Sequence, residues 1–157
     1  MSSPYVKNIA TLFGAGYLKG APGTWGSLVS LIPAYYIIEN LGAVAFYHAV
    51  VISFFVGVWA AGEHEKFTGG KDNSEIVIDE LCGQWIALIP LLFISPTGNW
   101  VADYMAAFIL FRIFDIAKPW PIRVIDKNLK GGLGVMLDDV LAGVIATALL
   151  YWGVPLL

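Results

Sequence analysis

The sequence has few charged residues for its length and a single cysteine. Only 13% of its 157 residues are charged, whereas 58% are hydrophobic. Soluble domains carry about 25% charged and roughly 45–50% apolar residues, so this chain has too little polar cover for a water-soluble surface. The net charge of −3 excludes a nucleic-acid-binding surface dominated by cations. The lone Cys82 excludes an internal disulfide, a cysteine-based zinc site and a CxxC redox pair, and we expect it to be buried.

Long hydrophobic runs dominate what is present. Residues 41–62 carry no formal charge and are numerous enough to span ~30 Å of hydrocarbon as a helix. The turn-forming segment 95–99 predicts a hairpin between two helices. No alternation typical of strands occurs. We therefore predict one all-α domain over residues 1–157, an integral membrane bundle with a short N-terminal helix and about five hydrophobic helices, over residues 24–38, 41–62, 81–94, 100–111 and 140–157.

The placement of charge predicts an orientation in a membrane. If the chain starts in the cytoplasm and crosses at each run, the opposite side keeps only Glu39 and Asp103 among the charged residues. An excess of cations on the cytoplasmic side is the main determinant of orientation. A soluble bundle with buried central helices, whose charges mark helix ends, is the alternative. The cytoplasmic side would hold all nine Lys and Arg residues: Lys7, Lys19, Lys66, Lys71, Arg112, Lys118, Arg123, Lys127 and Lys130.

The first acidic segment lies before the run at 81–94. Asp72 and Glu75 have capping-box spacing, which predicts a helix beginning at Asp72. Glu75 and Asp79 would then share one helix face, where like charges repel and a divalent cation would relieve the repulsion. A solvated acidic helix start explains Asp72 and Glu75. It does not explain Asp79 and Glu80, which lie about two turns further on.

The second segment combines two cations with an acid. Arg112, Asp115 and Lys118 follow i, i+3, i+6 spacing along one helical stripe, and Pro119 ends the helix. Two cations beside a carboxylate at a membrane surface would hold a phosphate next to a metal-binding acid. A cytoplasmic anchor with a simple salt bridge explains Arg112 and Lys118 about equally well.

The third segment is a glycine-rich stretch followed by two adjacent acids. We expect residues 131–134 to form a flexible loop, with Asp138 and Asp139 at the start of the last apolar helix. Exposing both carboxylates to lipid would cost a large free energy. Hard oxygen ligands of this kind suit Mg²⁺. Near the N-terminus, glycines with Thr24 and Ser27 would provide donors for an anion, although a plain loop with a helix cap explains them nearly as well.

Four motifs follow one another along the chain: Ala21-Pro22-Gly23-Thr24 with Gly26-Ser27-Leu28, then Glu75-Ile76-Val77-Ile78-Asp79-Glu80 with Gly83, then Phe111-Arg112-Ile113-Phe114-Asp115-Ile116 with Lys118-Pro119 and Pro121-Ile122, and finally Gly134-Val135-Met136 with Asp138-Asp139 and Ala142-Gly143. Together these motifs resemble the phosphatidylglycerophosphatase A family, and the resemblance covers about residues 10–145. It implies an all-helical, Mg²⁺-dependent lipid phosphatase that hydrolyses phosphatidylglycerophosphate to phosphatidylglycerol in phosphatidylglycerol biosynthesis, in the bacterial inner membrane. The placement of charge puts the site at the cytoplasmic face.

These segments predict a site with assigned roles. Arg112 and Lys118 would bind and stabilise the phosphate, with Thr24 and Ser27 as further substrate contacts. Asp115 is either another metal ligand or the general base. A rival function is a small cation-binding or transport protein that uses Asp79, Asp115 and Asp139 as a relay. The expected Mg²⁺ ligands are Asp79, Glu80, Asp138 and Asp139, and the expected catalytic residues are Asp79, Asp115, Asp139, Lys118 and Arg112.

Overall fold

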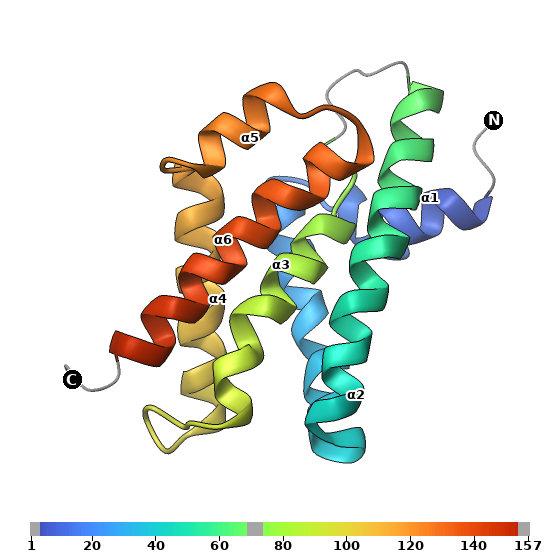
Figure 1. The fold of residues 1–157 in the computed structure, drawn as a ribbon. Coiled ribbons are helices and arrows are strands. Elements are labelled where there is room, and N and C mark those ends of the chain that lie inside the picture. Colours follow the sequence, from blue (N-terminus) through green and yellow to red (C-terminus); the bar gives the residue numbers. More distant parts are fainter. Residues whose placement is uncertain (1–3, 69–73, 154–157) are drawn as a thin grey trace.

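A computed structural model describes residues 4–68 and 74–153 of the chain, and these residues form helices and connecting turns without any strand. The all-α prediction is therefore confirmed. Figure 1 labels the longer elements. In chain order they are α1 (Pro4–Ala10), the short 3₁₀ helix η1 (Ala15–Tyr17), α2 (Pro22–Thr68), α3 (Ile78–Leu88), the 3₁₀ helix η2 (Ile89–Leu92), α4 (Trp100–Ala117), α5 (Ile122–Asn128) and α6 (Gly131–Gly153).

Helix α2 contains two of the predicted hydrophobic helices. Its helical geometry is interrupted at Gly42, where φ is 79° and ψ is 178°. A positive φ is available to glycine at little steric cost. The chain reverses direction at this point, so that the runs 24–38 and 41–62 become two arms of α2 (Figure 1).

The predicted turn between two helices is confirmed at 95–99. The side chain of Asn99 caps α4 by accepting hydrogen bonds from the N–H groups of Val101 and Ala102. The buried Asp103 carboxylate fixes the turn from inside the helix, because it accepts hydrogen bonds from the hydroxyl of Ser95 and from Thr97.

Two local predictions were wrong. The helix expected to begin at Asp72, which lies outside the described residues, begins only at Ile78, and Glu75 lies in a turn before it. Long-range contacts compete with the local capping pattern here, because the N–H of Val77 donates to the carbonyl of Ala10 at 2.9 Å. Residues 131–134, expected as a loop, form the first turn of α6 instead. They pack so closely that a Cβ added at Gly132 would overlap the backbone of α2.

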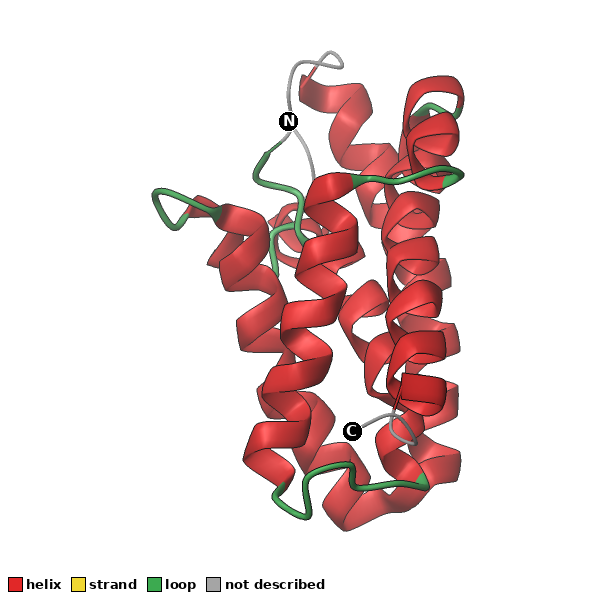
Figure 2. Ribbon diagram, turned by 90° about the vertical axis from the view of Figure 1, so that its left-hand side faces the viewer, coloured by secondary structure: helices red, strands yellow, loops and turns green. Residues whose placement is uncertain are grey.

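The buried helix α3 lies at the centre of the bundle and packs against α2, α4 and α6. One end of the bundle carries α1, α5 and the first turns of α3 and α6, whereas the break in α2 and the turn before α4 lie at the other end (Figures 1 and 2). Because α3 is central, Asp79 and Glu80 in its first turn lie inside the bundle, at the end that carries α1 and α5.

The outer surface of the bundle is strongly apolar. Two helices, α2 and α6, are long and hydrophobic enough to cross a membrane by the measure of length and composition. Ile32, Phe55 and Trp152 expose 72%, 66% and 72% of their surface. Many other large apolar side chains of the helices are exposed as well, and extensive apolar exposure is typical of a surface that contacts lipid or another protein. The number of five spanning hydrophobic helices stays a prediction.

Candidate active site

A pocket of about 770 Å³ opens at the end of the bundle where α3 and α6 begin. It lies between the N-terminus of α2, the first turns of α3 and α6, the end of α4, and α5. The three charged segments of the sequence therefore converge, although up to 60 residues separate them. Seven of the predicted site residues line this pocket, namely Asp79, Glu80, Arg112, Asp115, Lys118, Asp138 and Asp139.

Three carboxylates from three helices meet in the pocket, and we call them the carboxylate triad: Glu80 of α3, Asp115 of α4 and Asp139 of α6. One oxygen of each lies within 4.8 Å of the other two. All three residues are buried, and Oδ2 of Asp139 has no hydrogen-bond partner among the described residues. Buried carboxylates this close need a compensating cation, and three hard oxygen donors suit Mg²⁺. The donor set therefore fits the metal that the sequence predicts.

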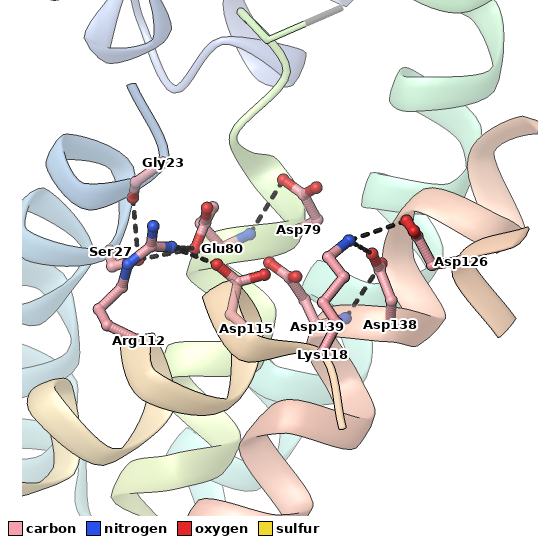
Figure 3. Close-up of polar contacts among 10 residues, drawn as sticks. All are labelled: Gly23, Ser27, Asp79, Glu80, Arg112, Asp115, Lys118, Asp126, Asp138 and Asp139. Atoms are coloured by element: carbon pink, nitrogen blue, oxygen red, sulfur yellow. Dashed lines mark hydrogen bonds and ion pairs between the residues drawn. The ribbon is translucent and has the colours of Figure 1, made fainter. Parts of the chain in front are cut away.

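Arg112 lies on the same stripe of α4 as Asp115 and joins two members of the triad. Its Nη1 lies 2.5 Å from Oε2 of Glu80 and 2.7 Å from Oδ2 of Asp115 (Figure 3). A single guanidinium thus offsets part of the negative charge of three acids. Arg112 also orients the two carboxylates that it contacts, because charge-assisted hydrogen bonds of this kind are short and directional.

The N-terminus of α2 supports Glu80 from the other side. The hydroxyl of Ser27 is fully buried and donates to Oε2 of Glu80 at 2.8 Å. A Cβ added at Gly23 would overlap Oε1 of the same carboxylate. Ser27 therefore holds Glu80 in place and does not line the pocket. Thr24 is half-buried one turn earlier and is also absent from the pocket lining.

Lys118 links α4, α5 and α6. It caps α4 in the left-handed conformation, with φ 41° and ψ 60°, which is uncommon for a residue with a side chain. Its Nζ lies 2.5 Å from Oδ2 of Asp138 and 2.8 Å from Oδ1 of Asp126 (Figure 3). Burial disfavours the charged ammonium, but the hydrogen bonds to the two carboxylates outweigh it and raise the pKa of Lys118 above its ordinary value. Lys118 is therefore a permanently charged cation beside the pocket.

The predicted metal ligands thus fall into two groups. Glu80 and Asp139 belong to the triad, with Asp115 as its third member. Asp138 also lines the pocket, but its carboxylate is paired with Lys118. Asp79 lines the pocket as well, and its Oδ1 accepts a hydrogen bond from the N–H of Glu80 at 3.0 Å. The division follows from helix geometry, because neighbouring residues on a helix point about 100° apart.

The structure adds residues that the sequence did not indicate. Asp126, Glu65 and Ser74 line the pocket, and His64 pairs with Glu75 beside it. Asp126 lies in a short charged segment that resembles an ordinary solvated helix. Nothing in the local sequence shows that it reaches back to Lys118.

The sequence is similar to that of several known proteins. The family model of phosphatidylglycerophosphatase A matches residues 8–154. Phosphatidylglycerophosphatase A of Escherichia coli K12 is 40% identical over 153 residues, which cover 97% of this chain and 84% of that protein. The corresponding Haemophilus influenzae protein is 38% identical over 148 residues, covering 92% and 88%. A putative phosphatidylinositol-3-phosphatase of Bacteroides thetaiotaomicron is 44% identical over 140 residues, covering 87% and 85%. No solved structure matches the chain significantly. The chain therefore belongs to the phosphatidylglycerophosphatase A family and is a phosphatase.

Proposed function

We propose that this chain is a Mg²⁺-dependent lipid phosphatase that converts phosphatidylglycerophosphate to phosphatidylglycerol and phosphate in phosphatidylglycerol biosynthesis. The observation that carries the proposal is the carboxylate triad, which three helices assemble beside Arg112 and Lys118 in one open pocket. A phosphomonoester carries up to two negative charges. It therefore needs a site that combines metal-binding acids with cations.

The triad residues Glu80, Asp115 and Asp139 would hold Mg²⁺, with Asp79 and Asp138 of the same pocket as further ligands or ligand supports. When bound, Mg²⁺ neutralises phosphate charge and makes a bound water more acidic. Arg112 contacts one oxygen of Glu80 and one of Asp115 and thereby holds these two carboxylates in a fixed orientation. This arrangement prepares the site before the substrate arrives.

Lys118 and Asp79 are proposed to act on the substrate and on water. Lys118 stays charged at neutral pH, and its ammonium would stabilise the phosphate oxygens as the ester bond breaks. Among the described residues, Oδ2 of Asp79 accepts no hydrogen bond. Asp79 is therefore free to take a proton from the attacking water while the bond between phosphorus and the glycerol oxygen breaks. The glycerol oxygen gains a proton from solvent, which the open pocket admits.

The membrane location rests on the distribution of charge and apolar surface. The pocket and the cations around it lie at one end of the bundle, and the helices carry many exposed apolar side chains. If these side chains face the bilayer, the pocket lies near the membrane surface, where a lipid with its acyl chains in the bilayer presents its phosphate. We place the chain in the bacterial inner membrane, as a multi-pass protein with the pocket on the cytoplasmic side. A cation transporter would instead need acids on a path open to both sides.

The decisive experiment is phosphate release by the purified chain in detergent micelles that contain phosphatidylglycerophosphate, with Mg²⁺ or with EDTA. We expect release only with Mg²⁺. Phosphatidylinositol 3-phosphate is the comparison substrate, because one relative carries the name of a phosphatase for that lipid. Faster turnover of the inositol lipid would replace the proposed substrate, and no release from either lipid would refute the proposed function.

The membrane location needs a separate measurement. After the cells are broken, we expect the chain to sediment with membranes and to enter solution only with detergent. If it stays in the aqueous phase without detergent, the membrane location is wrong.

A further inference from the structure

A buried histidine beside the pocket has no role in the proposed chemistry. His64 lies near the end of α2 and is only 3% exposed. Its Nε2 lies 2.7 Å from Oε1 of Glu75, which belongs to the turn that precedes α3. The other ring nitrogen, Nδ1, is buried and has no partner among the described residues. Burying the unpaired Nδ1 costs folding free energy, which suggests that the contact of Nε2 with Glu75 has a role of its own.

The contact lies where α3 is otherwise weakly defined. The residue before the helix, Val77, makes no capping hydrogen bond with its side chain. The position of the helix start therefore depends on contacts with other elements. The N–H of Val77 donates to the carbonyl of Ala10, and Gly16 packs so closely that a Cβ there would overlap the carbonyl oxygen of Glu75. The His64–Glu75 pair adds the connection to α2.

This turn leads directly into two acids of the pocket. Asp79 and Glu80 follow Glu75 by four and five residues, in the first turn of α3. A helix is stiff, so a shift or rotation of its first turn moves both carboxylates relative to Asp115 and Asp139. Metal sites tolerate ligand displacements of only about 0.2 Å.

From these contacts we propose that the His64–Glu75 pair is a positioning device that fixes the first turn of α3, and through it Asp79 and Glu80, for metal binding. The inference rests on the proposed function as a metal-dependent phosphatase. His64 does not line the pocket and is not part of the triad, so it acts through α3 and does not touch the substrate.

The test uses the full chain in detergent and two readouts. Mn²⁺ affinity is measured without substrate, from the electron paramagnetic resonance signal of free Mn²⁺, and steady-state phosphate release gives kcat and KM. His64→Ala should weaken Mn²⁺ binding about 10- to 100-fold, as is typical when a group that orients a metal ligand is removed. We expect kcat to fall while the KM for lipid changes less than about threefold, because the lipid contacts are untouched.

Matched variants separate positioning from a general loss of structure. His64→Gln places an amide donor near the position of Nε2 and should restore most of the affinity. His48→Ala changes an exposed histidine of α2 whose Nδ1 lies 2.8 Å from the carbonyl oxygen of Val44 in the same helix, and it should have no effect. In the double variant His64→Ala with Glu75→Ala, the loss should be no larger than in either single variant, because both remove the same contact.

The outcomes are distinct. If His64→Ala keeps wild-type Mn²⁺ affinity and kcat, the positioning role is refuted. If that variant does not fold, Glu75→Ala removes the other partner, whose side chain is 34% exposed, and unchanged Mn²⁺ affinity there refutes the proposal equally. If Mn²⁺ binding weakens as expected but the wild-type chain releases no phosphate from the lipid, the proposed function fails and the positioning role stands.

Discussion

The crossing of α3 and α6 allows a sharp test of how the carboxylate triad is assembled. The two helices touch at Gly83 and Gly143, where a Cβ at either position would meet the backbone of the other helix. Gly83 follows Glu80 by three residues and packs against the carbonyl oxygen of Asp139. The absence of a side chain at this crossing therefore brings two members of the triad together.

The change Gly83→Ala should separate them. Its Cβ would lie 2.6 Å from the carbonyl oxygen of Asp139 and 2.5 Å from Cε2 of Phe111, whereas ordinary contacts begin at 3.4 Å. The helices must move apart by about 0.8 Å to relieve the first contact. Overpacking of this kind costs about 1–3 kcal/mol. A misplacement near 1 Å also costs about 100-fold in rate.

We therefore expect Gly83→Ala to lower kcat/KM for phosphate release about 100-fold and to raise the half-saturating Mg²⁺ concentration. The Tm should fall by roughly 2–12 °C, the range that corresponds to this loss for a domain of this size. Gly153→Ala is the matched control, because a Cβ at the end of α6 meets nothing within 4 Å. Activity of Gly83→Ala within twofold of the wild-type chain would show that close approach of these helices does not set the site.

Three further variants test individual charges. Mg²⁺ at 100 times the Kd should raise the free energy of unfolding of the wild-type chain by about 2.7 kcal/mol, and we expect Asp139→Asn to lose this stabilisation. Equal stabilisation of both proteins, measured by denaturant titration, would contradict the ligand role. Arg112→Met leaves Glu80 and Asp115 buried without their cation, so metal-free unfolding should become easier by about 3–5 kcal/mol, measured by denaturant titration. Lys118 has a raised pKa, so its stabilising contribution is complete below the unfolded value of 10.5 and is lost only as the pH rises through the folded value. The Tm difference between wild type and Lys118→Ala should thus be the same at pH 7 and pH 9, and a difference that shrinks by pH 9 would be inconsistent with this.

The acids of the site could be predicted from the sequence because each departs from its local pattern. Asp79, Asp115 and Asp139 interrupt or adjoin apolar helices, where a carboxylate has no structural benefit. The turn between two helices at 95–99 was also predictable, because turn-forming residues act through their own backbone. Signals of this type depend on the local sequence, so contacts with distant parts of the chain do not change them.

Features that depend on distant partners could not be predicted in this way. The spacing of Asp72 and Glu75 is a sound capping pattern, yet contacts with α1, η1 and His64 hold Glu75 outside the helix. His64 itself resembles an ordinary packed histidine in the sequence, because its partner lies eleven residues away in another element. The long side chain of Lys118 likewise reaches Asp126 only because the chain turns sharply between α4 and α5.

The division of the acids into ligands and supports follows from the same distinction. The sequence predicts metal binding for both members of each adjacent pair, Asp138 with Asp139 and Asp79 with Glu80. In the fold, packing of α3 against α6 decides which acid of each pair faces the triad, and the other acid takes a different partner. Because a helix rotation of 100° would exchange the members of each pair, the groups that fix rotation are as important to the site as the carboxylates themselves. The small residues at the helix crossing and the His64–Glu75 pair are such groups, and substitutions there should alter metal binding although none of them touches the metal.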